Sequence, residues 1–353
     1  MEVPKTMKAL VVQDGKQVAV QDHPVPLIGD DDILVKIVAV AQNPTDYKFI
    51  DSGRGKPGTV LGCDWSGNVV KVGQDVTSVK VGDHVAGFVM GGMFPDSGAY
   101  AEYVKTPAEL AWVVPPGTLS HEEAATMGCA FWTAIQALYH PTRLGLVEPP
   151  ANTTEDEQWV YIHGGSSSVG QFAVQLASLS GYKVATTASP RNFDLVRSLG
   201  ASAVFDYADP DVVAKIKAAS GDAIRAALDT IGVRDAQATS VEVVAPGGGK
   251  VVHILQVIPD VSARTDVERI YTLLYWALGR AFSFGPNADH PARPEDRAHM
   301  VHFLKKVPGL VKDGLVKPLP IKLWEGGLAA IPDGLQYMRE GRVHAEKIVY
   351  RVS

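Results

Sequence analysis

The chain has 353 residues, of which 46% are hydrophobic and 20% charged, as is typical of globular proteins that bury large cores. Its formal net charge of −6 argues against nucleic acids and anionic membrane surfaces as partners, because binding to them requires a basic face. The two cysteines, Cys63 and Cys129, exclude a disulfide framework and a four-cysteine structural zinc lobe. The length suggests about two domains.

Neither the start nor the apolar stretches of the sequence predict membrane targeting. The first residues do not form a signal peptide, because no apolar segment follows a basic start. The longest nonpolar stretches, such as residues 270–284, contain Arg280 and are too short to span a bilayer. We therefore expect no membrane partner and a cytosolic location.

Short β-prone runs and turn residues dominate the chain up to about residue 117. Residues 7–12, 18–21 and 33–40 are predicted strands, and glycines and prolines punctuate the rest of this segment. This pattern predicts an all-β, barrel-like first domain. Helical sequence begins at Ser120, which has the capping-box spacing to Glu123, and an alanine-rich helix pattern follows.

Strands and helices alternate after a polar surface loop that we expect at residues 145–158. Such alternation is typical of a parallel, doubly wound sheet. The tail, residues 319–323 and 347–352, returns to short strands, so we expect it to complete the first domain. The alternating strands are predicted at residues 159–163, 183–188, 203–205, 224–229 and 250–255, with helices at 169–180, 192–199 and 235–244.

The strand predicted at residues 159–163 runs into a glycine- and serine-rich loop that opens the next helix. Small residues let the backbone approach a pyrophosphate, and the helix N-terminus supplies free N–H groups and a positive dipole end. The spacing is not a strict GxGxxG, so an ordinary βα turn is the alternative, but the βαβ context favours a dinucleotide. The expected contacts are Gly165, Ser166, Ser167, Ser168, Val169 and Gly170.

The end of the second strand predicts which dinucleotide binds. NAD sites usually carry an acidic residue there for the ribose 2′-hydroxyl, and residues 186–192 contain none. We predict NADPH, because this segment offers donors and a positive charge for a 2′-phosphate. The alternative is an exposed loop arginine beside a serine that caps a helix. The residues expected around the phosphate are Ser189, Pro190, Arg191, Asn192 and, unless it is simply a loop aromatic, Tyr207.

Motifs along nearly the whole chain resemble those of the medium-chain dehydrogenase/reductase superfamily. They follow the family's order: NPTD at residues 43–46, GCDWSGNVVKVG at 62–73, GDHV at 82–85, GAYAEY at 98–103, and then the Gly/Ser loop. The resemblance implies an α/β fold with an N-terminal GroES-like β-barrel domain plus a Rossmann doubly wound parallel sheet. We expect the GroES-like catalytic domain at residues 1–126 and 288–353 and the NADPH-binding domain at 127–287.

Within the superfamily the chain looks most like the trans-acting enoyl reductases that partner fungal polyketide synthases. SPRNFDL at 189–195, LGA at 199–201, VFDY at 204–207, the insertion before Trp159 and DYK at 46–48 carry this likeness. It implies hydride transfer from NADPH to the β-carbon of an α,β-unsaturated polyketide thioester on an acyl carrier domain of the synthase. It also implies a monomer, although residues 270–275 are a candidate edge strand for pairing or a pocket wall.

Zinc-bearing members of the superfamily place a cysteine at the position of Asn43 and a histidine at that of Cys63, followed by an acidic residue. Here Asn43 is a poor zinc ligand and only Cys63 and Asp64 remain, while a chance site with His84 has unsuitable spacing. We therefore expect no metal. Reduction of a conjugated double bond needs no Lewis acid, because the carbonyl already draws electrons to itself.

Lys48 is the first candidate catalytic residue, because it follows the NPTD turn and would donate to the cofactor ribose, the carbonyl or a relayed water. A surface lysine is the equally open alternative. Asp46 is expected to bond the turn backbone. The further expected cofactor contacts are Thr45, Asp46, Tyr47 and Lys48 in this turn, Ile254 and Leu255 at the end of the last sheet strand, and His344 and Ala345 in the tail.

Two segments resemble the walls of the substrate pocket in these reductases, and core helix or buried strand is the alternative for each. In that alternative Cys129 is a small hydrophobe. Cys63 has no evident paired base and is treated as a buried thiol. The expected substrate contacts are Met127, Gly128, Cys129, Ala130, Phe131, Trp132, Thr133 and Ala134, followed by Ala277, Leu278, Gly279, Arg280 and Ala281.

Three rival functions share the same sequence features. A stand-alone NADPH-dependent quinone or enone reductase would use the same cofactor site without a carrier partner. A non-catalytic NADPH-binding protein is a rival from another class, because a fold does not determine a function. An alcohol dehydrogenase is disfavoured by the missing metal ligands.

Overall fold

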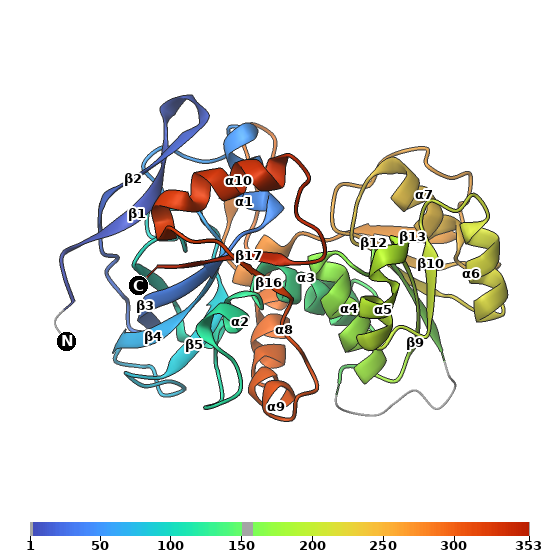
Figure 1. Cartoon of the computed structure of the whole chain (residues 1–353), viewed down its shortest axis with the longest axis horizontal. Helices are drawn as coiled ribbons and strands as arrows, with labels where there is room; N and C mark the ends of the chain where they lie inside the picture. The colour runs from blue at the N-terminus through green and yellow to red at the C-terminus, as the bar shows by residue number, and fades with distance from the viewer. Residues whose placement is uncertain (1–2, 150–157, 353) are drawn as a thin grey trace. The chain divides into compact units, whose positions relative to one another are not determined.

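The computed structural model describes residues 3–149 and 158–352, and the chain forms two compact units (Figure 1). The first unit consists of Met1–Cys129 and Tyr275–Ser353, and the second of Ala130–Leu274. The sequence predicted that the domains meet after residues 126 and 287, and this division remains a proposal. Residues 145–149 contain no helix or strand, whereas residues 150–157 of the expected polar loop lie outside the described residues.

The first unit is built around a seven-stranded sheet. Its order is β16-β17-β3-β4-β5-β7, with β6 paired to β3, and β1 and β2 form a separate antiparallel pair. The C-terminal strand β17 pairs antiparallel with β3, so the tail completes this unit as expected. The strands are β1 (Thr6–Gln13), β2 (Gln17–Pro24), β3 (Asp32–Ala41), β4 (Asp64–Val72), β5 (His84–Phe88), β6 (Tyr103–Pro107), β7 (Ala111–Val113), β16 (Ile321–Leu323) and β17 (Lys347–Arg351).

Alternating burial explains how these strands build two cores. In β3, Ile33, Val35 and Ile37 join one hydrophobic cluster, whereas Leu34 joins another on the opposite face. The period of two follows from the strand geometry, which points successive side chains to opposite faces. Because both faces of β3 are covered, it lies in the middle of the packing of this unit.

Short helices close the first unit. The capping box expected at Ser120 is present: Ser120 Oγ accepts from the Glu123 amide at 3.1 Å, and the Glu123 carboxylate accepts from the Ser120 amide at 2.8 Å. The helices are α1 (Pro44–Asp51), α2 (His121–Ala125), α8 (Pro294–Leu304), α9 (Val307–Lys312) and α10 (Ile331–Arg339), with 3₁₀ turns at Asp14–Lys16, Ala108–Leu110, Leu274–Leu278 and Gly327–Ala330 and a small hairpin of β14 (Phe282–Ser283) and β15 (Asp289–His290).

The second unit is a doubly wound sheet of six parallel strands in the order β10-β9-β8-β11-β12-β13 (Figure 1). This is the Rossmann order 3-2-1-4-5-6, with the switch point between β8 and β11, so the predicted fold is confirmed. Its elements are α3 (Cys129–Tyr139), β8 (Trp159–His163), α4 (Ser168–Leu179), β9 (Lys183–Ala188), the 3₁₀ turn Pro190–Asn192, α5 (Phe193–Ser198), β10 (Ala203–Asp206), α6 (Val212–Ser220), β11 (Ala226–Asp229), α7 (Arg234–Glu242), β12 (Gly249–His253) and β13 (Val267–Tyr271).

The sheet differs from the sequence prediction at one side. The strand predicted at residues 250–255 ends at His253, and it is not the last strand, because β13 pairs beyond it. Ile254 and Leu255 therefore follow the fifth strand of the sheet. The edge-strand alternative for residues 270–275 is realised only through Tyr271, since β13 covers Val267–Tyr271. The sequence prediction had no strand at 267–269, where Glu268 and Arg269 interrupt the apolar pattern.

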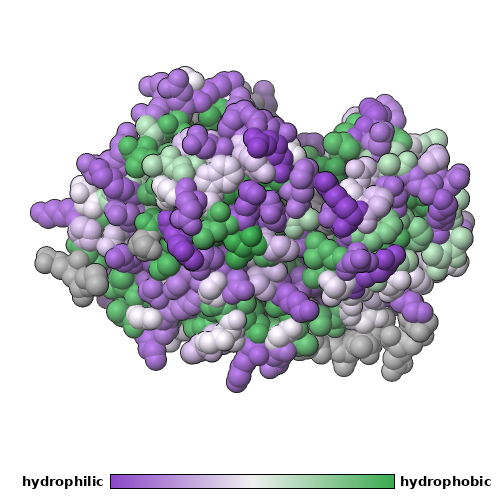
Figure 2. Space-filling view, viewed as in Figure 1, coloured by the Kyte–Doolittle hydropathy of each residue, from purple (hydrophilic) through white to green (hydrophobic). Residues whose placement is uncertain are grey.

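The protein surface is largely polar on the face shown in Figure 2, as the charged composition predicts. Figure 2 shows hydrophilic residues spread over the visible face, interrupted by smaller hydrophobic areas. Within residues 3–149 and 158–352, no helix combines the length and the hydropathy that crossing a membrane requires.

Two histidines of the first unit share one serine hydroxyl. Their rings are tilted by 43° with centroids 3.7 Å apart, and Ser66 Oγ lies 2.8 Å from His84 Nε2 and 3.0 Å from His121 Nδ1. Burial, and then the neighbouring His121, lower the pKa of His84 to about 4. Burial also lowers the pKa of His121.

This pair makes stability depend on pH. Below the ordinary pKa of 6.5 the unfolded chain takes up a proton that folded His84 does not accept until about pH 4. The contribution of His84 to the free energy of unfolding should therefore be lost as the pH is lowered through this window, whereas the raised pKa of Asp46 acts in the opposite direction. Urea titrations at several pH values should show this loss as a difference in pH slope between wild type and His84→Asn, and His302→Asn, at an exposed position on α8, should keep the wild-type slope. An unchanged pH slope in His84→Asn would contradict the assignment.

Candidate functional site

The loop between β8 and α4 needs glycine at two points. Gly164 has φ +79°, and a side chain there would meet Ile231 and Thr230 within 2.8 Å. A Cβ on Gly170 would lie 2.1 Å from the Gly164 carbonyl oxygen. The first turn of α4 therefore packs directly on the end of β8, where a side chain at position 170 has no room.

The N-terminus of α4 offers unpaired amides. Ser167 caps the helix, because its Oγ accepts from the Gly170 amide at 2.9 Å. In the part of the chain that the structure describes, no acceptor is recorded for the amides of Ser166, Ser168 and Val169. Unpaired N–H groups at the positive end of a helix dipole are suited to a phosphate. This turn is the strongest candidate binding site in the second unit.

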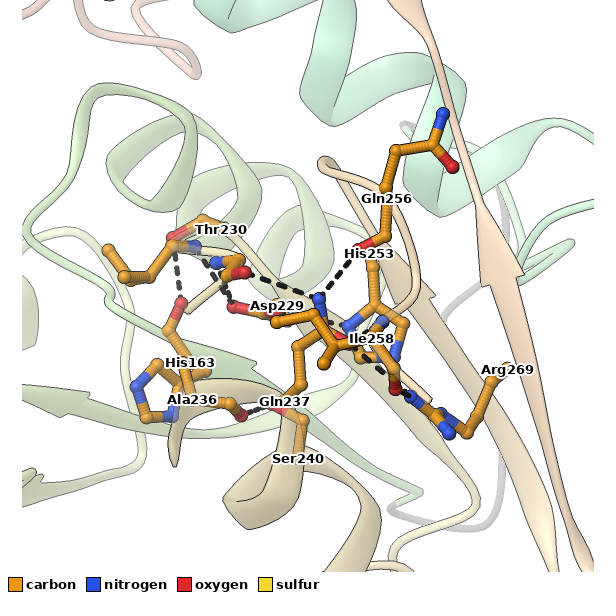
Figure 3. A network of polar contacts seen from close by, with 12 residues as sticks. His163, Asp229, Thr230, Ala236, Gln237, Ser240, His253, Gln256, Ile258 and Arg269 are labelled. Atoms are coloured by element: carbon orange, nitrogen blue, oxygen red, sulfur yellow. Dashed lines mark hydrogen bonds and ion pairs between the residues drawn. The ribbon is translucent and has the colours of Figure 1, made fainter. Parts of the chain in front are cut away.

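Buried polar residues fix this turn to the neighbouring strand. Thr230 Oγ1 donates to the His163 carbonyl at 2.7 Å (Figure 3) and lies 2.8 Å from Ser167 Oγ. Asp229 accepts from the amides of Ile231 and Gly232, both at 2.9 Å. The carboxyl ends of β8 and β11, where ligands bind in such sheets, are thus held by hydrogen bonds.

Asp229 and His253 were not predicted from the sequence, although each ends a strand. His253 Nδ1 lies 3.0 Å from the Asp229 carboxylate, and both side chains are fully buried (Figure 3). Gln237 connects the loops after β11 and β12, since its amide donates to the Gly232 and Gln256 carbonyls. Polar residues at the ends of strands were the sequence signal that could have revealed this network. The network holds the loops at the strand ends, where the candidate site lies.

An apolar shelf lies at the same strand ends. Ile231, Val233 and Leu255 are 39%, 57% and 42% exposed, which is unusual for large hydrophobic side chains. Leu255 packs closely against Gly232, since a Cβ on that glycine would lie 2.7 Å from it. Leu255 belongs to this shelf, and the neighbouring Ile254 is half-buried.

The residues expected around a 2′-phosphate share one edge of the sheet. Ala188 of β9 pairs with Asp206 of β10, so Ser189 and Tyr207 each follow one residue later. Arg191 is exposed in the turn Pro190–Asn192, and Tyr207 is 58% exposed. The structure thus brings these residues to adjacent strand ends, with Asn192 half-buried beside them in the same turn.

The NPTD turn of the first unit begins helix α1. Asp46 bonds its backbone as expected, because its Oδ2 accepts from the Asn43 amide at 2.7 Å and from the Tyr100 hydroxyl at 2.7 Å. Burial raises the pKa of Asp46 to about 7, despite these hydrogen bonds. Tyr47 is half-buried beneath the Arg339 guanidinium, and Lys48 is exposed. Exposure of Lys48 fits both of its interpretations, so its role remains a proposal.

The two expected substrate segments divide between core and surface. Phe131, Trp132 and Ala134 are fully buried in α3, as the core-helix alternative expects, and so is Ala277. Arg280 is exposed at the surface, where it pairs with Asp96. The other members of both segments are buried (Met127, Gly128, Ala130, Thr133), half-buried (Cys129, Leu278, Gly279) or exposed (Ala281), and in the tail His344 is exposed and Ala345 half-buried.

The chain matches two protein families and is similar to several named enzymes. Residues 29–116 match the family model of the alcohol dehydrogenase GroES-like domain, and residues 168–261 match that of the zinc-binding dehydrogenases. The trans-enoyl reductase ACTTS2 of Alternaria alternata is 39% identical, with 98% of this chain and 99% of the relative aligned. The trans-enoyl reductase caaB of Aspergillus niger is 34% identical, over 99% and 98%.

The chain belongs to the trans-enoyl reductase family. It is therefore a pyridine-nucleotide-dependent oxidoreductase of the medium-chain dehydrogenase/reductase superfamily, as the sequence motifs predicted. The crystal structure of CurK enoyl reductase shares the fold, with a TM-score of 0.76 at 21% identity over 99% of each chain. An alcohol dehydrogenase superfamily protein from Novosphingobium aromaticivorans has a TM-score of 0.79 at 26% identity, covering 99% of this chain and all of its own.

The zinc that one family model implies does not fit the residues of this trans-enoyl reductase. The Lys347 ammonium donates to Asn43 Oδ1 and lies 3.1 Å from Asp64 Oδ2, so a cation of the protein already neutralises this carboxylate. Asn43 Nδ2 also donates to Asp64 Oδ2, at 2.8 Å. Burial raises the pKa of Cys63 well above its usual range, which disfavours the thiolate that zinc needs. No cluster of three potential metal ligands occurs in residues 3–149 and 158–352.

Removal of the Lys347 charge should destabilise the protein strongly. The Lys347 and Asp64 side chains are 2% and 0% exposed, so Lys347→Met would leave a buried carboxylate unpaired. Loss of one partner of a buried pair costs about 3–5 kcal/mol, which chemical denaturation would measure.

A surface lysine of the same unit provides the control. Lys322 lies 3.6 Å from Glu346 and is 35% exposed, so Lys322→Met should cost less than about 1 kcal/mol. Adding Asp64→Asn to Lys347→Met should restore part of the lost stability, because the unpaired charge is removed. A loss in Lys347→Met no larger than in Lys322→Met would refute the argument.

Proposed function

We propose that this chain is a trans-acting enoyl reductase that uses NADPH to reduce an α,β-unsaturated polyketide thioester carried on an acyl carrier domain of a partner synthase. Relatives named trans-enoyl reductases support it along their full length. The observation that carries the cofactor part is the set of unpaired amides at Ser166, Ser168 and Val169. We further propose that the protein acts as a cytosolic monomer.

The residues of the second unit fit NADPH. We propose that the three amides bind the diphosphate and that the apolar shelf, together with Ile254, supports the nicotinamide. His344 and Ala345 in the tail of the first unit are further proposed cofactor contacts. When bound, NADPH would supply a hydride. Ser189, Arg191, Asn192 and Tyr207 form an edge rich in donors, where the turn carries no carboxylate to select a ribose 2′-hydroxyl.

The first unit contributes polar groups for the thioester. In the proposed reaction the hydride adds to the β-carbon, negative charge develops on the carbonyl oxygen, and a proton then adds to the α-carbon. Lys48, as an exposed ammonium, would donate to that oxygen or to a water beside it. Residues 127–134 and 277–281 remain the proposed walls for the acyl chain.

Arg191 should determine the choice between NADPH and NADH. Arg191→Ala removes a charge-assisted hydrogen bond worth about 1.5–3 kcal/mol, so the KM for NADPH should rise about 10- to 100-fold. The KM for NADH should hardly change. Arg197→Ala is the control, because Arg197 is exposed on the adjacent α5 and pairs with Asp194 at 3.2 Å. An equal effect of Arg191→Ala on both cofactors would contradict the 2′-phosphate assignment.

Turnover with defined substrates tests the reaction itself. Wild-type protein should oxidise NADPH with enoyl groups on a carrier protein or on pantetheine, and more efficiently on the carrier. Lys48→Ala should lower kcat about 100-fold if the ammonium stabilises the oxyanion. Lys56→Ala, an exposed lysine just beyond α1, should have no effect. NADPH binding without turnover of any enoyl thioester would favour the non-catalytic alternative, and preference for free enones would favour the quinone reductase alternative.

A further inference from the structure

The buried phenol of Tyr275 contacts the Thr45 hydroxyl in the first unit. Tyr275 is 6% exposed, and its hydroxyl lies 2.5 Å from Thr45 Oγ1, although 230 residues separate the two in sequence. The rings of Phe49, Phe88 and Phe284 surround the tyrosine ring at centroid distances of 5.8, 5.9 and 6.1 Å. The aromatic cluster leaves the phenol little freedom to turn elsewhere, whereas Thr45 is half-exposed.

The phenol keeps its proton at physiological pH. Burial raises the pKa of Tyr275 well above its usual range, and the nearby Cys63 and Cys129 act in the same direction. Within residues 3–149 and 158–352, Thr45 Oγ1 is the one hydrogen-bond partner recorded for this hydroxyl. A buried hydroxyl proton needs an acceptor, so the phenol donates to Thr45.

This direction of donation determines what Thr45 can do. A threonine hydroxyl has one proton and two lone pairs, and the phenol occupies a lone pair. The Thr45 proton is then directed away from the aromatic cluster, towards the half-exposed side of the residue. Thr45 therefore presents a donor, on the turn that also carries Lys48.

We propose that Tyr275 is a positioning residue that holds the Thr45 hydroxyl as a donor to the carbonyl oxygen of the enoyl thioester. This role rests on the proposed function. Hydride addition forms the β-carbon–hydrogen bond, and the electron pair of the double bond shifts onto the oxygen, where the Thr45 donor stabilises the charge. A proton from water then completes the α-carbon, the cofactor leaves oxidised, and Thr45 and Tyr275 keep their own protons throughout.

Four variants test the pair. Removal of an oxyanion donor costs about 10²–10³ in kcat, so Thr45→Val should lower kcat about 100-fold, and Tyr275→Phe, which acts through Thr45, about 10-fold. Thr45→Ser keeps the hydroxyl and should stay within about threefold of wild type. The double variant Thr45→Val/Tyr275→Phe should be no slower than Thr45→Val alone, because the phenol has nothing left to orient. NADPH affinity should not change in any of them, which distinguishes this role from the cofactor contact that the sequence predicted for Thr45.

A second phenol–hydroxyl pair is the matched control. Tyr139 lies 2.9 Å from Ser180 and is likewise buried, but it belongs to the second unit. Tyr139→Phe should change the melting temperature without changing kcat. Rates are measured as loss of reduced-nicotinamide absorbance with a carrier-bound enoyl thioester, cofactor affinity by calorimetry, and folding by thermal melts.

The outcomes separate this role from the proposed function. If wild type reduces no enoyl thioester, the proposed function and this role both fail. If wild type is active but Tyr275→Phe equals it, or the two single losses multiply in the double variant, only the positioning role fails. A weaker NADPH affinity with unchanged kcat also overturns it, because Thr45 would then serve the cofactor. If Tyr275→Phe does not fold, the contrast between Thr45→Ser and Thr45→Val decides, and equal losses in both overturn the role.

Discussion

The buried ammonium of Lys347 connects three segments on which the first unit depends. It lies on the C-terminal strand β17 and bonds Asn43, 304 residues earlier, and the carboxylate of Asp64 on β4. Asn43 caps α1, and Asp64 also accepts from the Cys129 amide at 2.6 Å. A buried charge is tolerated only when it is paired, so these segments must assemble together. These bonds fix the NPTD turn, which carries the proposed substrate-binding residues.

The same cluster does not fit the zinc that one family model implies. A metal site needs converging anionic or neutral donors and no competing cation. Here Lys347 supplies the positive charge, Asn43 acts as an amide hydrogen-bonding group, and the Cys63 thiol is buried. Double-bond reduction requires donors to a developing oxyanion rather than a Lewis acid, and protein hydroxyl and ammonium groups supply such donors.

In the second unit, the residues that hold the loops in place differ from those that are exposed to a ligand. Asp229 and Gln237 are buried and bond the backbone of the loops that follow β11 and β12, and the buried His253 bonds the Asp229 carboxylate. The same loops carry Ile231, Val233 and Leu255, whose apolar side chains are exposed. Polar groups that hold a site and apolar groups that receive a ligand are thus drawn from the same short stretches of chain.

Local patterns in the sequence were sufficient for the fold class, although they missed the edge strand β13. The period-two strands, the capping box at Ser120, the glycine at Gly170 and the missing acid after β9 depend on neighbours within a few residues, so their meaning is readable along the chain. Only the tertiary structure revealed that Lys347 pairs with Asp64, that the Tyr275 hydroxyl bonds Thr45 and that His253 bonds Asp229. These partners are far apart in sequence, and a lone lysine, tyrosine or histidine carries no local signal of its partner, because packing of the whole sheet decides which side chains meet.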